Sequence, residues 1–293
     1  MMNVPEAVRG LLSARRADTH KGDYGHVLLL AGSPGLTGAA ALCALGALRC
    51  GSGLVTVGVP ASLQDVMAAK VTEAMTWALP ETKARTLAAT AAHEVLVSAG
   101  SYDAVALGPG LSLQPATVST VQRLVAQLPK PLVVDADGLT ALVDGLGAVK
   151  QATAPRVLPP HPGELSRLLQ QPVTEIQRNR EAIAQRVARE WRCVVVLKGH
   201  RTVVADIDGR VYVNETGHAG MAAGGMGDVL TGMIVSLIGQ GLMPFAAAKL
   251  GVYLHGVAGE LARERIGEAG LLASEVAHTI PQAIRGYLQD APA

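Results

Sequence analysis

The sequence has 293 residues, of which 49% are hydrophobic and 17% charged, so it can bury a large core and is not typical of a disordered chain. Its formal net charge of +1 and its aromatic content of 3% favour neither nucleic acid nor a membrane surface as a partner. No stretch is apolar over the length of a membrane span, and the three cysteines have no metal-like spacing. We therefore expect buried, reduced thiols and a cytoplasmic protein.

Short apolar runs alternate with helical patterns along most of the chain. The runs predicted as strands are GHVLLLAGS (25–33), LVTVGVP (54–60), AMTWALP (74–80), DAVALGPG (103–110), PLVVDADG (131–138), RVLPPHPG (156–163) and CVVVLKGH (193–200). The clearest helical patterns between them are GAAALCALGALRCG (38–51), PATVSTVQRLVAQL (115–128) and VTEIQRNREAIAQRVAREW (173–191). This alternation predicts an α/β fold in which helices cover both faces of a central, mostly parallel sheet.

The last third of the chain has a different pattern. Asp208-Gly209 lies between two β-rich runs in TVVADIDGRVYVNE (202–215), which predicts a hairpin at the edge of the sheet. Helical patterns then cover 244–266 and 273–290, and we expect His255 to pack inside the first of these helices. Because no linker or repeat interrupts the chain, we expect residues 1–293 to form a single domain.

Five of the predicted strands end in unusual loops, which are AGSPGLTG (31–38), LGPGL (107–111), DADG (135–138), PPHPGE (159–164) and KGHRT (198–202). Each loop alone has an ordinary interpretation. Asp135 and Asp137 could cap a helix that begins near Leu139, His161 could be a core histidine, and Lys198 could be a surface lysine. Because the carboxyl ends of parallel strands meet at one edge of a sheet, the five loops together indicate a site there.

The stretch AAGGMGDVLTGMI (222–234) adds a glycine-rich helix start to this edge. Gly224, Gly225 and Gly227 allow a close approach to the backbone, and the helix that follows points free N–H groups and its positive dipole end at an anion. Asp228 places a carboxylate in the same position. This pairing predicts a base that works beside a phosphate, although Asp228 could also serve only as a helix cap.

The motifs in their order resemble the ADP-dependent NAD(P)H-hydrate dehydratases, which are repair enzymes of the ribokinase-like superfamily. The segments that carry the resemblance are KGDYGHVLLLAGSPGLTGAAALCALGALRCGSGLVTV, LGPGL, VVDADGL, PHPGE, VLKGHRTVV and NETGHAGMAAGGMGDVLTGMI, and it runs from about His20 to the C-terminus. It implies a ribokinase-like fold and a lyase that restores NADH and NADPH from their hydrated S-epimers, while ADP becomes AMP and phosphate. Some relatives carry an epimerase domain ahead of this one, and with only about twenty residues before the match we expect none here.

The resemblance also implies residue roles. Asp228 matches the catalytic base, and the N–H groups of Gly225, Met226 and Gly227 would stabilise the transferring phosphoryl group. Residues matching the ADP site, around its AMP part, are Lys198, Gly199, His200, Arg201, Thr202 and Gly227. Residues matching the hydrate site are Ala39 or Ala40, Gly110, His161 and Asp228. Mg²⁺ is implied as a cofactor and a homotetramer as the assembly. Asp135 and Asp137 resemble residues near the phosphates or the Mg²⁺, but we assign no residue as a metal ligand.

Three positions depart from the family pattern, and two other function classes stay open. Pro159 stands where the family more often has threonine, Met226 where threonine or alanine is commoner, and His218 where asparagine is usual. A small-molecule kinase of the same superfamily, acting on a sugar or a pyrimidine alcohol, would use the same helix start and the same acid. A catalytically silent nucleotide-binding protein would not require Asp228 at the helix start.

Overall fold

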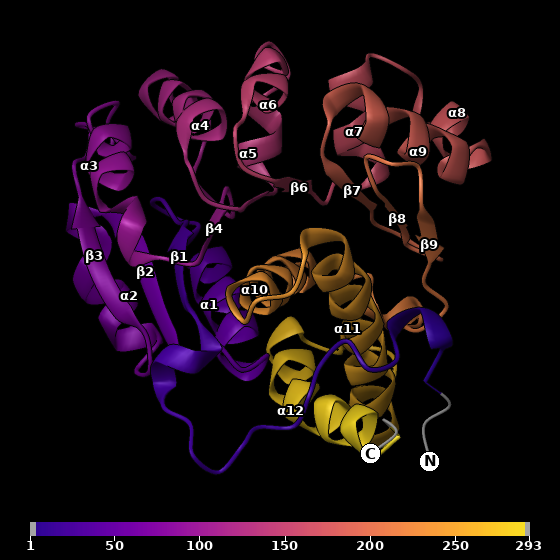
Figure 1. The fold of residues 1–293 in the computed structure, drawn as a ribbon. Coiled ribbons are helices and arrows are strands. Elements are labelled where there is room, and N and C mark those ends of the chain that lie inside the picture. The colour runs from indigo at the N-terminus through magenta and orange to yellow at the C-terminus, as the bar shows by residue number, and fades with distance from the viewer. Residues whose placement is uncertain (1–3, 291–293) are drawn as a thin grey trace.

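The computed structural model describes residues 4–290, which are built around one sheet of nine strands in the order β3-β2-β1-β4-β5-β6-β7-β8-β9 (Figure 1). Strands β1 to β7 run parallel, whereas β8 pairs antiparallel with β7, and β9 with β8. The mostly parallel sheet and its edge hairpin are therefore confirmed. The strands are β1 (His26–Leu30), β2 (Leu54–Pro60), β3 (Met75–Leu79), β4 (Ala104–Leu107), β5 (Leu132–Val134), β6 (Arg156–Leu158), β7 (Val194–Leu197), β8 (Val203–Ala205) and β9 (Val211–Val213).

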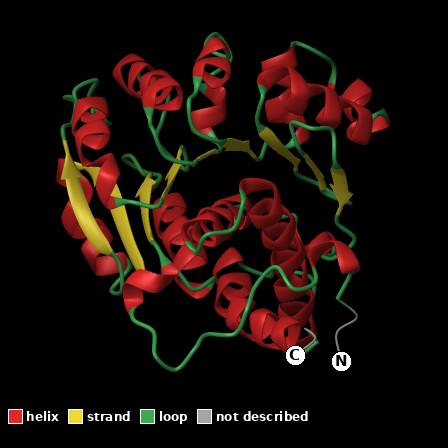
Figure 2. Ribbon diagram, in the orientation of Figure 1, coloured by secondary structure: helices red, strands yellow, loops and turns green. Residues whose placement is uncertain are grey.

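Helices cover both faces of the sheet, as predicted (Figure 2). One face carries α1 (Thr37–Arg49), α2 (Gln64–Lys70), α10 (Met226–Gly239), α11 (Pro244–Ile266) and α12 (Ala273–Gln289). The other carries α3 (Ala91–Ser98), α4 (Pro115–Gln127), α5 (Asp137–Thr140), α6 (Gly147–Gln151), α7 (Pro162–Leu169), α8 (Val173–Arg178) and α9 (Arg180–Trp191). Among the helices of residues 4–290, we find none long and apolar enough to cross a membrane.

The two faces are separated by the alternation of side chains along each strand. In β1, Val27 and Leu29 belong to the hydrophobic cluster that α1, α10, α11 and α12 complete. Leu28 and Leu30 point the other way, into the cluster under α3 to α9. All four side chains are fully buried. A continuous apolar strand sequence therefore reflects burial on both faces.

The helical pattern predicted over 173–191 is not one helix. Helix α8 ends at Arg178, and α9 begins at Arg180 after a break at Asn179, where φ is −130° and ψ is 38°. The hydrophobic spacing continues on both sides of the break, because Ile176 and Ile183 pack in the same cluster. Periodicity alone therefore did not reveal the break.

The buried polar groups match their sequence-based interpretation. Cys43, Cys50 and Cys193 are free and buried, and burial raises the pKa of the Cys50 thiol to about 12, so it stays neutral. His255 is buried within α11, and burial lowers its pKa to about 4. These residues belong to the interior, as expected.

Candidate active site

The glycine-rich segment ends in the first turn of α10, a helix that packs against β1, β4 and β5. Gly225 is the N-cap residue, and its φ of 89° is a left-handed conformation that glycine adopts without strain. A Cβ at this position would lie 2.4 Å from Cδ1 of Leu42 on α1, so a larger residue there would also displace that side chain. The first N–H groups of α10 have no side-chain cap, which is the arrangement that attracts an anion.

Asp228 is the third residue of α10 and makes no capping hydrogen bond, so its interpretation as a helix cap is wrong. Burial first, and then the negative charge of Asp135, raise the pKa of Asp228 from 3.8 to about 7. Lys198 opposes this rise, whereas Asp137 and Glu164 add to it. A carboxyl group with a pKa near neutrality can both take up and release a proton at neutral pH.

The five predicted loops follow β1, β4, β5, β6 and β7, which are parallel neighbours in the sheet, so their meeting at one edge is confirmed. Gly110 joins two of these loops. Its φ is 64°, and a Cβ there would lie 2.7 Å from the carbonyl oxygen of Leu36 and 3.2 Å from Cβ of Ala39. Gly110 and Ala39 are thus neighbours, while the side chain of Ala40 is fully buried in the core.

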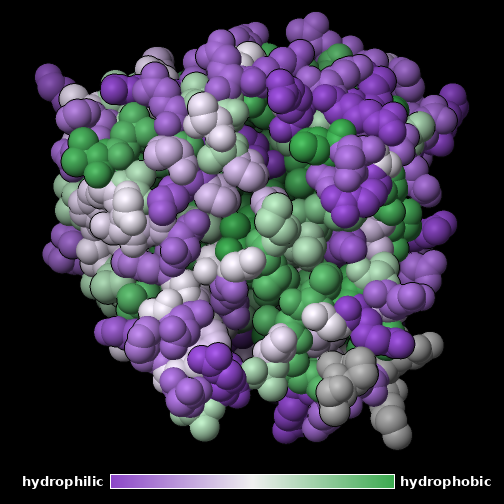
Figure 3. Space-filling view, viewed as in Figure 1, coloured by the Kyte–Doolittle hydropathy of each residue, from purple (hydrophilic) through white to green (hydrophobic). Residues whose placement is uncertain are grey.

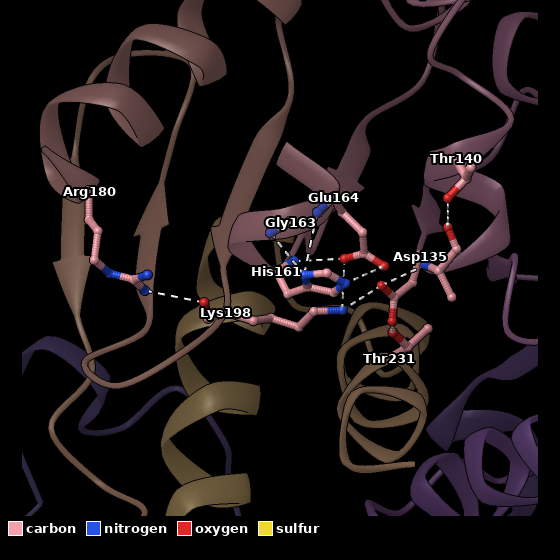
Figure 4. A network of polar contacts seen from close by, with 9 residues as sticks. Asp135, Thr140, His161, Gly163, Glu164, Arg180, Lys198 and Thr231 are labelled. Carbon is pink, nitrogen blue, oxygen red and sulfur yellow. Dashed lines mark hydrogen bonds and ion pairs between the residues drawn. The ribbon is translucent and has the colours of Figure 1, made fainter. Parts of the chain in front are cut away.

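A buried polar network connects three strand ends with α10 (Figure 4). Asp135 follows β5 and is 1% exposed. Its Oδ1 accepts hydrogen bonds from Nζ of Lys198 at 2.6 Å and from the N–H of Ala136 at 2.8 Å. Its Oδ2 accepts one from Oγ1 of Thr231, in α10, at 2.6 Å. Nζ of Lys198 also lies 3.7 Å from Oε2 of Glu164, so Lys198 is not a surface lysine.

The charges of this network depend on one another. Burial acts to lower the pKa of Lys198, but the carboxylates of Asp135 and Glu164 outweigh it, and the pKa is raised overall. Burial raises the pKa of Glu164, and the charge of Lys198 opposes that rise. The lysine is therefore a permanent cation that compensates the acids around it.

His161 begins α7 as its N-cap and is not a core histidine. Its Nδ1 accepts from the N–H groups of Gly163 at 3.0 Å and Glu164 at 3.3 Å, and the Glu164 carboxylate accepts from the His161 N–H at 2.7 Å. This capping box fixes the ring, whose side chain remains 51% exposed. Burial, then the charges of Lys198 and Arg167, lower the pKa of His161, so the ring is neutral at pH 7.

The segment 198–202 faces two surroundings. The Lys198 side chain turns into the network, whereas His200 and Arg201 line a cavity of about 350 Å³ beside the start of α9. Gly199 has φ of 136°, and Oγ1 of Thr202 donates to its carbonyl oxygen at 2.9 Å, which closes the turn. Of the predicted nucleotide residues, Lys198 therefore joins the network, whereas His200 and Arg201 line this cavity.

Asp137 is the first residue of α5 and does not cap a helix near Leu139. Its Oδ2 accepts the N–H of Ser112 at 2.8 Å. Ala136 precedes it with φ of 52°, a conformation that turns Asp135 and Asp137 apart, the first into the network and the second toward the loop after β4. Within residues 4–290, no group of three or more His, Cys, Asp or Glu side chains is arranged to hold a metal ion.

Sequence analysis did not identify Thr231 or Arg180. Thr231 lies three residues after Asp228, on the same face of α10. The signal available in the sequence was a threonine within an apolar run. Arg180 begins α9, and its Nη2 donates to the carbonyl oxygen of Leu197 at 2.8 Å, which ties the helix to the end of β7. No local motif marks that arginine, because its partner is a backbone group 17 residues away.

A second cavity, of about 850 Å³, lies away from this edge, between the N-terminal segment 11–24 and the C-terminal ends of α1 and α10. Arg15 donates to the carbonyl oxygen of Gly51, and Nε2 of Gln240 donates to that of Cys50 at 3.2 Å. These side chains satisfy carbonyl groups at helix ends. No candidate catalytic or binding residue identified in the sequence lines this cavity, so its size alone does not make it the active site.

A glycine-rich helix start with an acid, placed at the carboxyl edge of a mostly parallel sheet, defines the class as ribokinase-like. A crystal structure described as a ribokinase-like superfamily protein, from Enterococcus faecalis V583, superposes with a TM-score of 0.80 and 26% identity, covering 94% of this chain and 92% of that chain. The family profile described as NAD(P)H-hydrate dehydratase matches residues 27–282. The chain belongs to the NAD(P)H-hydrate dehydratase family.

Two further relatives are similar over nearly the whole chain. The bifunctional NAD(P)H-hydrate repair enzyme Nnr of Moorella thermoacetica is 48% identical over 282 residues, covering 96% of this chain and 53% of the relative. The chain thus spans about half the length of the curated relatives it matches first. The crystal structure of the ADP/ATP-dependent NAD(P)H-hydrate dehydratase from Bacillus subtilis, co-crystallised with ATP and Mg²⁺, has a TM-score of 0.82 and 34% identity, covering 98% of this chain and 100% of that chain.

Proposed function

We propose that the protein dehydrates the S-epimers of hydrated NADH and hydrated NADPH, with conversion of ADP to AMP and phosphate. The observation that carries this proposal is Asp228, an acid with a pKa of about 7 in the first turn of a helix with free N–H groups. Family membership and the similarity to the ADP/ATP-dependent enzyme of Bacillus subtilis support the substrate and the nucleotide. The reaction would return the cofactors to their redox-active form.

In this mechanism, Asp228 takes the proton of the hydroxyl group on the hydrated nicotinamide ring. The hydroxyl oxygen forms a bond to the terminal phosphorus of ADP, and the bond from that phosphorus to the AMP oxygen breaks. The N–H groups of Gly225, Met226 and Gly227 stabilise the charge on the transferring group. The ring then loses phosphate together with a proton from the neighbouring carbon, which restores the double bond.

We propose that the two substrates meet across the start of α10. Residues 198–202 and Gly227 hold the AMP part of ADP, with the cavity of about 350 Å³ beside His200 and Arg201 as the space available for it. Ala39, Gly110 and His161 hold the hydrate on the other side. Ala40 can contribute through its backbone, because its side chain is fully buried.

Mg²⁺ fits the chemistry of this edge, because the free donors are carboxylate oxygens, which hard cations prefer. We prefer Asp137 to Asp135 as a ligand, because Asp135 already accepts three hydrogen bonds, whereas Asp137 accepts one, from Ser112. We propose that Asp137 and the phosphates of the nucleotide hold the ion. When bound, it would neutralise phosphate charge.

Two of the departures from the family pattern have structural roles that leave the proposed chemistry intact. His218 accepts the N–H of Gly220 at 3.1 Å and its Nε2 lies 3.0 Å from the carbonyl oxygen of Gly259, so it fastens the loop before α10 to α11. Met226 is 6% exposed and packs in the core. Pro159 is also buried.

We also propose that the chain forms one domain in a cytoplasmic homotetramer. Both hydrophobic clusters pack on the same sheet, which supports a single domain. The free cysteines are consistent with a reducing compartment. Hydrophobic residues gather over α10, α11 and α12 on the face shown in Figure 3, and Met243 and Leu272 are 73% and 59% exposed, which supports self-association. Light scattering after size exclusion would test the tetramer.

The direct test incubates the purified protein with hydrated NADH and either ADP or ATP, with Mg²⁺ present. We expect the absorbance of NADH to return, with equal amounts of AMP and phosphate when ADP is used. The Asp228→Asn variant should fail, while Asp65→Asn, a change at an exposed acid on α2, should not. If hydrated NADH is unchanged while a sugar or pyrimidine alcohol is phosphorylated, the protein is a kinase and the proposal is wrong.

A further inference from the structure

The network in Figure 4 contains a hydrogen bond between the end of β5 and α10 that has no role in the reaction proposed above. Thr231 is fully buried in α10, and its hydroxyl donates to Oδ2 of Asp135 at 2.6 Å. Asp135 is almost as deeply buried, and its other oxygen is held by Lys198 and by its neighbouring backbone N–H. A carboxylate with three donors in the interior has little freedom to move.

This link acts on the first turn of α10. Thr231 follows Asp228 by three residues, so both side chains lie on the same face of the helix. A Cβ on Gly227 would lie 3.3 Å from Nζ of Lys198 and 3.8 Å from Oδ2 of Asp135, which places both charges beside the helix start. The bond from Thr231 to Asp135 therefore anchors the turn that carries the acid.

We propose, on the basis of the proposed function, that Thr231 and Asp135 are positioning residues that hold the start of α10 and keep Asp228 in place for proton transfer. Thr231 fixes the helix through its hydroxyl. Asp135 retains Lys198 beside the helix start and presents its own negative charge to Asp228. Neither residue needs to touch the substrates for this role.

The groups around Asp228 come from five parts of the fold, and their charges set the direction in which each variant should shift the pKa of Asp228. Asp135 after β5, Asp137 in α5 and Glu164 in α7 raise the pKa of Asp228, whereas Lys198 after β7 lowers it. On α1, burial raises the pKa of Cys43 well above its ordinary value, so that thiol stays neutral. The pKa of Asp228 thus depends on the opposing charges of one lysine and three acids.

Two variants should move Asp228 in opposite directions. Asp135→Asn removes a negative charge and frees Lys198 to approach the acid, so the pKa of Asp228 falls toward 3.8. Thr231→Val keeps the shape of the side chain but removes the hydroxyl, so Asp135 draws more closely on Lys198 and the pKa of Asp228 rises. A packing role alone would not produce opposite shifts.

The experiment combines steady-state kinetics with carboxyl carbon NMR of the full chain labelled at aspartate, with the Asp228 signal assigned by its loss in Asp228→Asn. We expect Thr231→Val to lower kcat by about 10- to 100-fold, as a small displacement of a reacting group does, with the KM for ADP changed much less. Thr231→Ser, which keeps the hydroxyl, should recover most of kcat. The matched control is Ser236→Ala, because Ser236 is a buried hydroxyl further along the same helix, bonded to Ser52 at 2.8 Å and outside the network.

Opposite titration shifts in the two variants, with Ser236→Ala unshifted, support the proposal. An unmoved Asp228 titration in both variants overturns it, as does an equal loss of kcat in Thr231→Val and Thr231→Ser. If Thr231→Val does not fold, Thr231→Ser and Asp135→Asn still decide the outcome by NMR. If wild-type protein dehydrates nothing but the titration shifts occur, the positioning role holds and the proposed reaction is the part that fails.

Discussion

The two ends of helix α10 differ in whether their backbone polar groups have hydrogen-bond partners. At its C-terminal end, Gln240 donates to the carbonyl oxygens of Cys50 and Ser236 at 3.2 and 3.3 Å, and Ser236 pairs with Ser52. At its start, a glycine cap leaves N–H groups free beside Asp228. The larger cavity, of about 850 Å³, adjoins the satisfied end, and the smaller one, of about 350 Å³, lies at the edge of the sheet that carries the network. We therefore base the proposed site on free polar groups and not on cavity volume.

The largest effect should come from Asp228 itself. Asp228→Asn cannot accept a proton, so we expect kcat to fall by about 10²–10⁴-fold, the usual value of general-base assistance. Nucleotide binding should persist or tighten, because a negative charge near the phosphates is removed. Kinetics and calorimetry with AMP measure the two effects. Near-normal turnover would remove Asp228 from the chemistry.

The same variant has a pH signature in stability. The pKa of Asp228 is raised in the folded state, so its ionisation destabilises the fold above about pH 7 and costs nothing below about pH 4. Asp228→Asn removes this cost. Its melting temperature should therefore exceed that of the wild type at pH 8 and equal it at pH 4. A variant that is less stable at pH 8 contradicts the raised pKa.

Lys198→Met should have the next largest effect. It leaves Asp135 buried without its cation, and breaking a buried ion pair typically costs about 3–5 kcal/mol. Since Lys198 lowers the pKa of Asp228, its loss should move the acid limb of the pH–rate profile upward. We also expect the KM for ADP to rise more than that for the hydrate. Equal changes in both constants would place Lys198 outside the nucleotide site.

His161 separates binding from helix capping. His161→Asn retains a capping acceptor, whereas His161→Ala does not and should lose about 1 kcal/mol of stability. Both should raise the KM for the hydrate by roughly 3- to 10-fold, the effect of one lost hydrogen bond, with AMP binding nearly intact. If His161→Asn has a normal KM for the hydrate, the residue is a cap and nothing more.

The smallest effect on catalysis should come from a substitution in the cavity at the C-terminal end of α10. Arg49 lines the cavity of about 850 Å³ and is exposed. Arg49→Gln should change kcat and both KM values by no more than about twofold, as expected for a surface substitution. A tenfold loss would show that this cavity takes part in the reaction and would reverse the comparison of the two ends.

Much of this site could be predicted from the sequence, because parallel strands bring their following loops to one edge. On that basis the sequence predicted that Lys198 and His161 lie at one edge, and the glycine-rich helix start added Asp228; their roles stay predictions. The hydrogen-bond partners of the site residues could not be predicted, because Asp135 and Thr231 are 96 residues apart in the sequence and Arg180 donates to a backbone carbonyl group. The start of α10 could not be predicted from the hydrophobic pattern, because the helix follows an N-cap, Gly225, with a positive φ that such a pattern does not encode.

The pH dependence of kcat/KM for the hydrate tests the central claim most directly, since it reports the ionisation of the free enzyme. If Asp228 is the base, kcat/KM should fall on the acid side with a slope of one and a pKa of about 7. A profile that stays flat down to about pH 4, near the ordinary aspartate pKa, would contradict it.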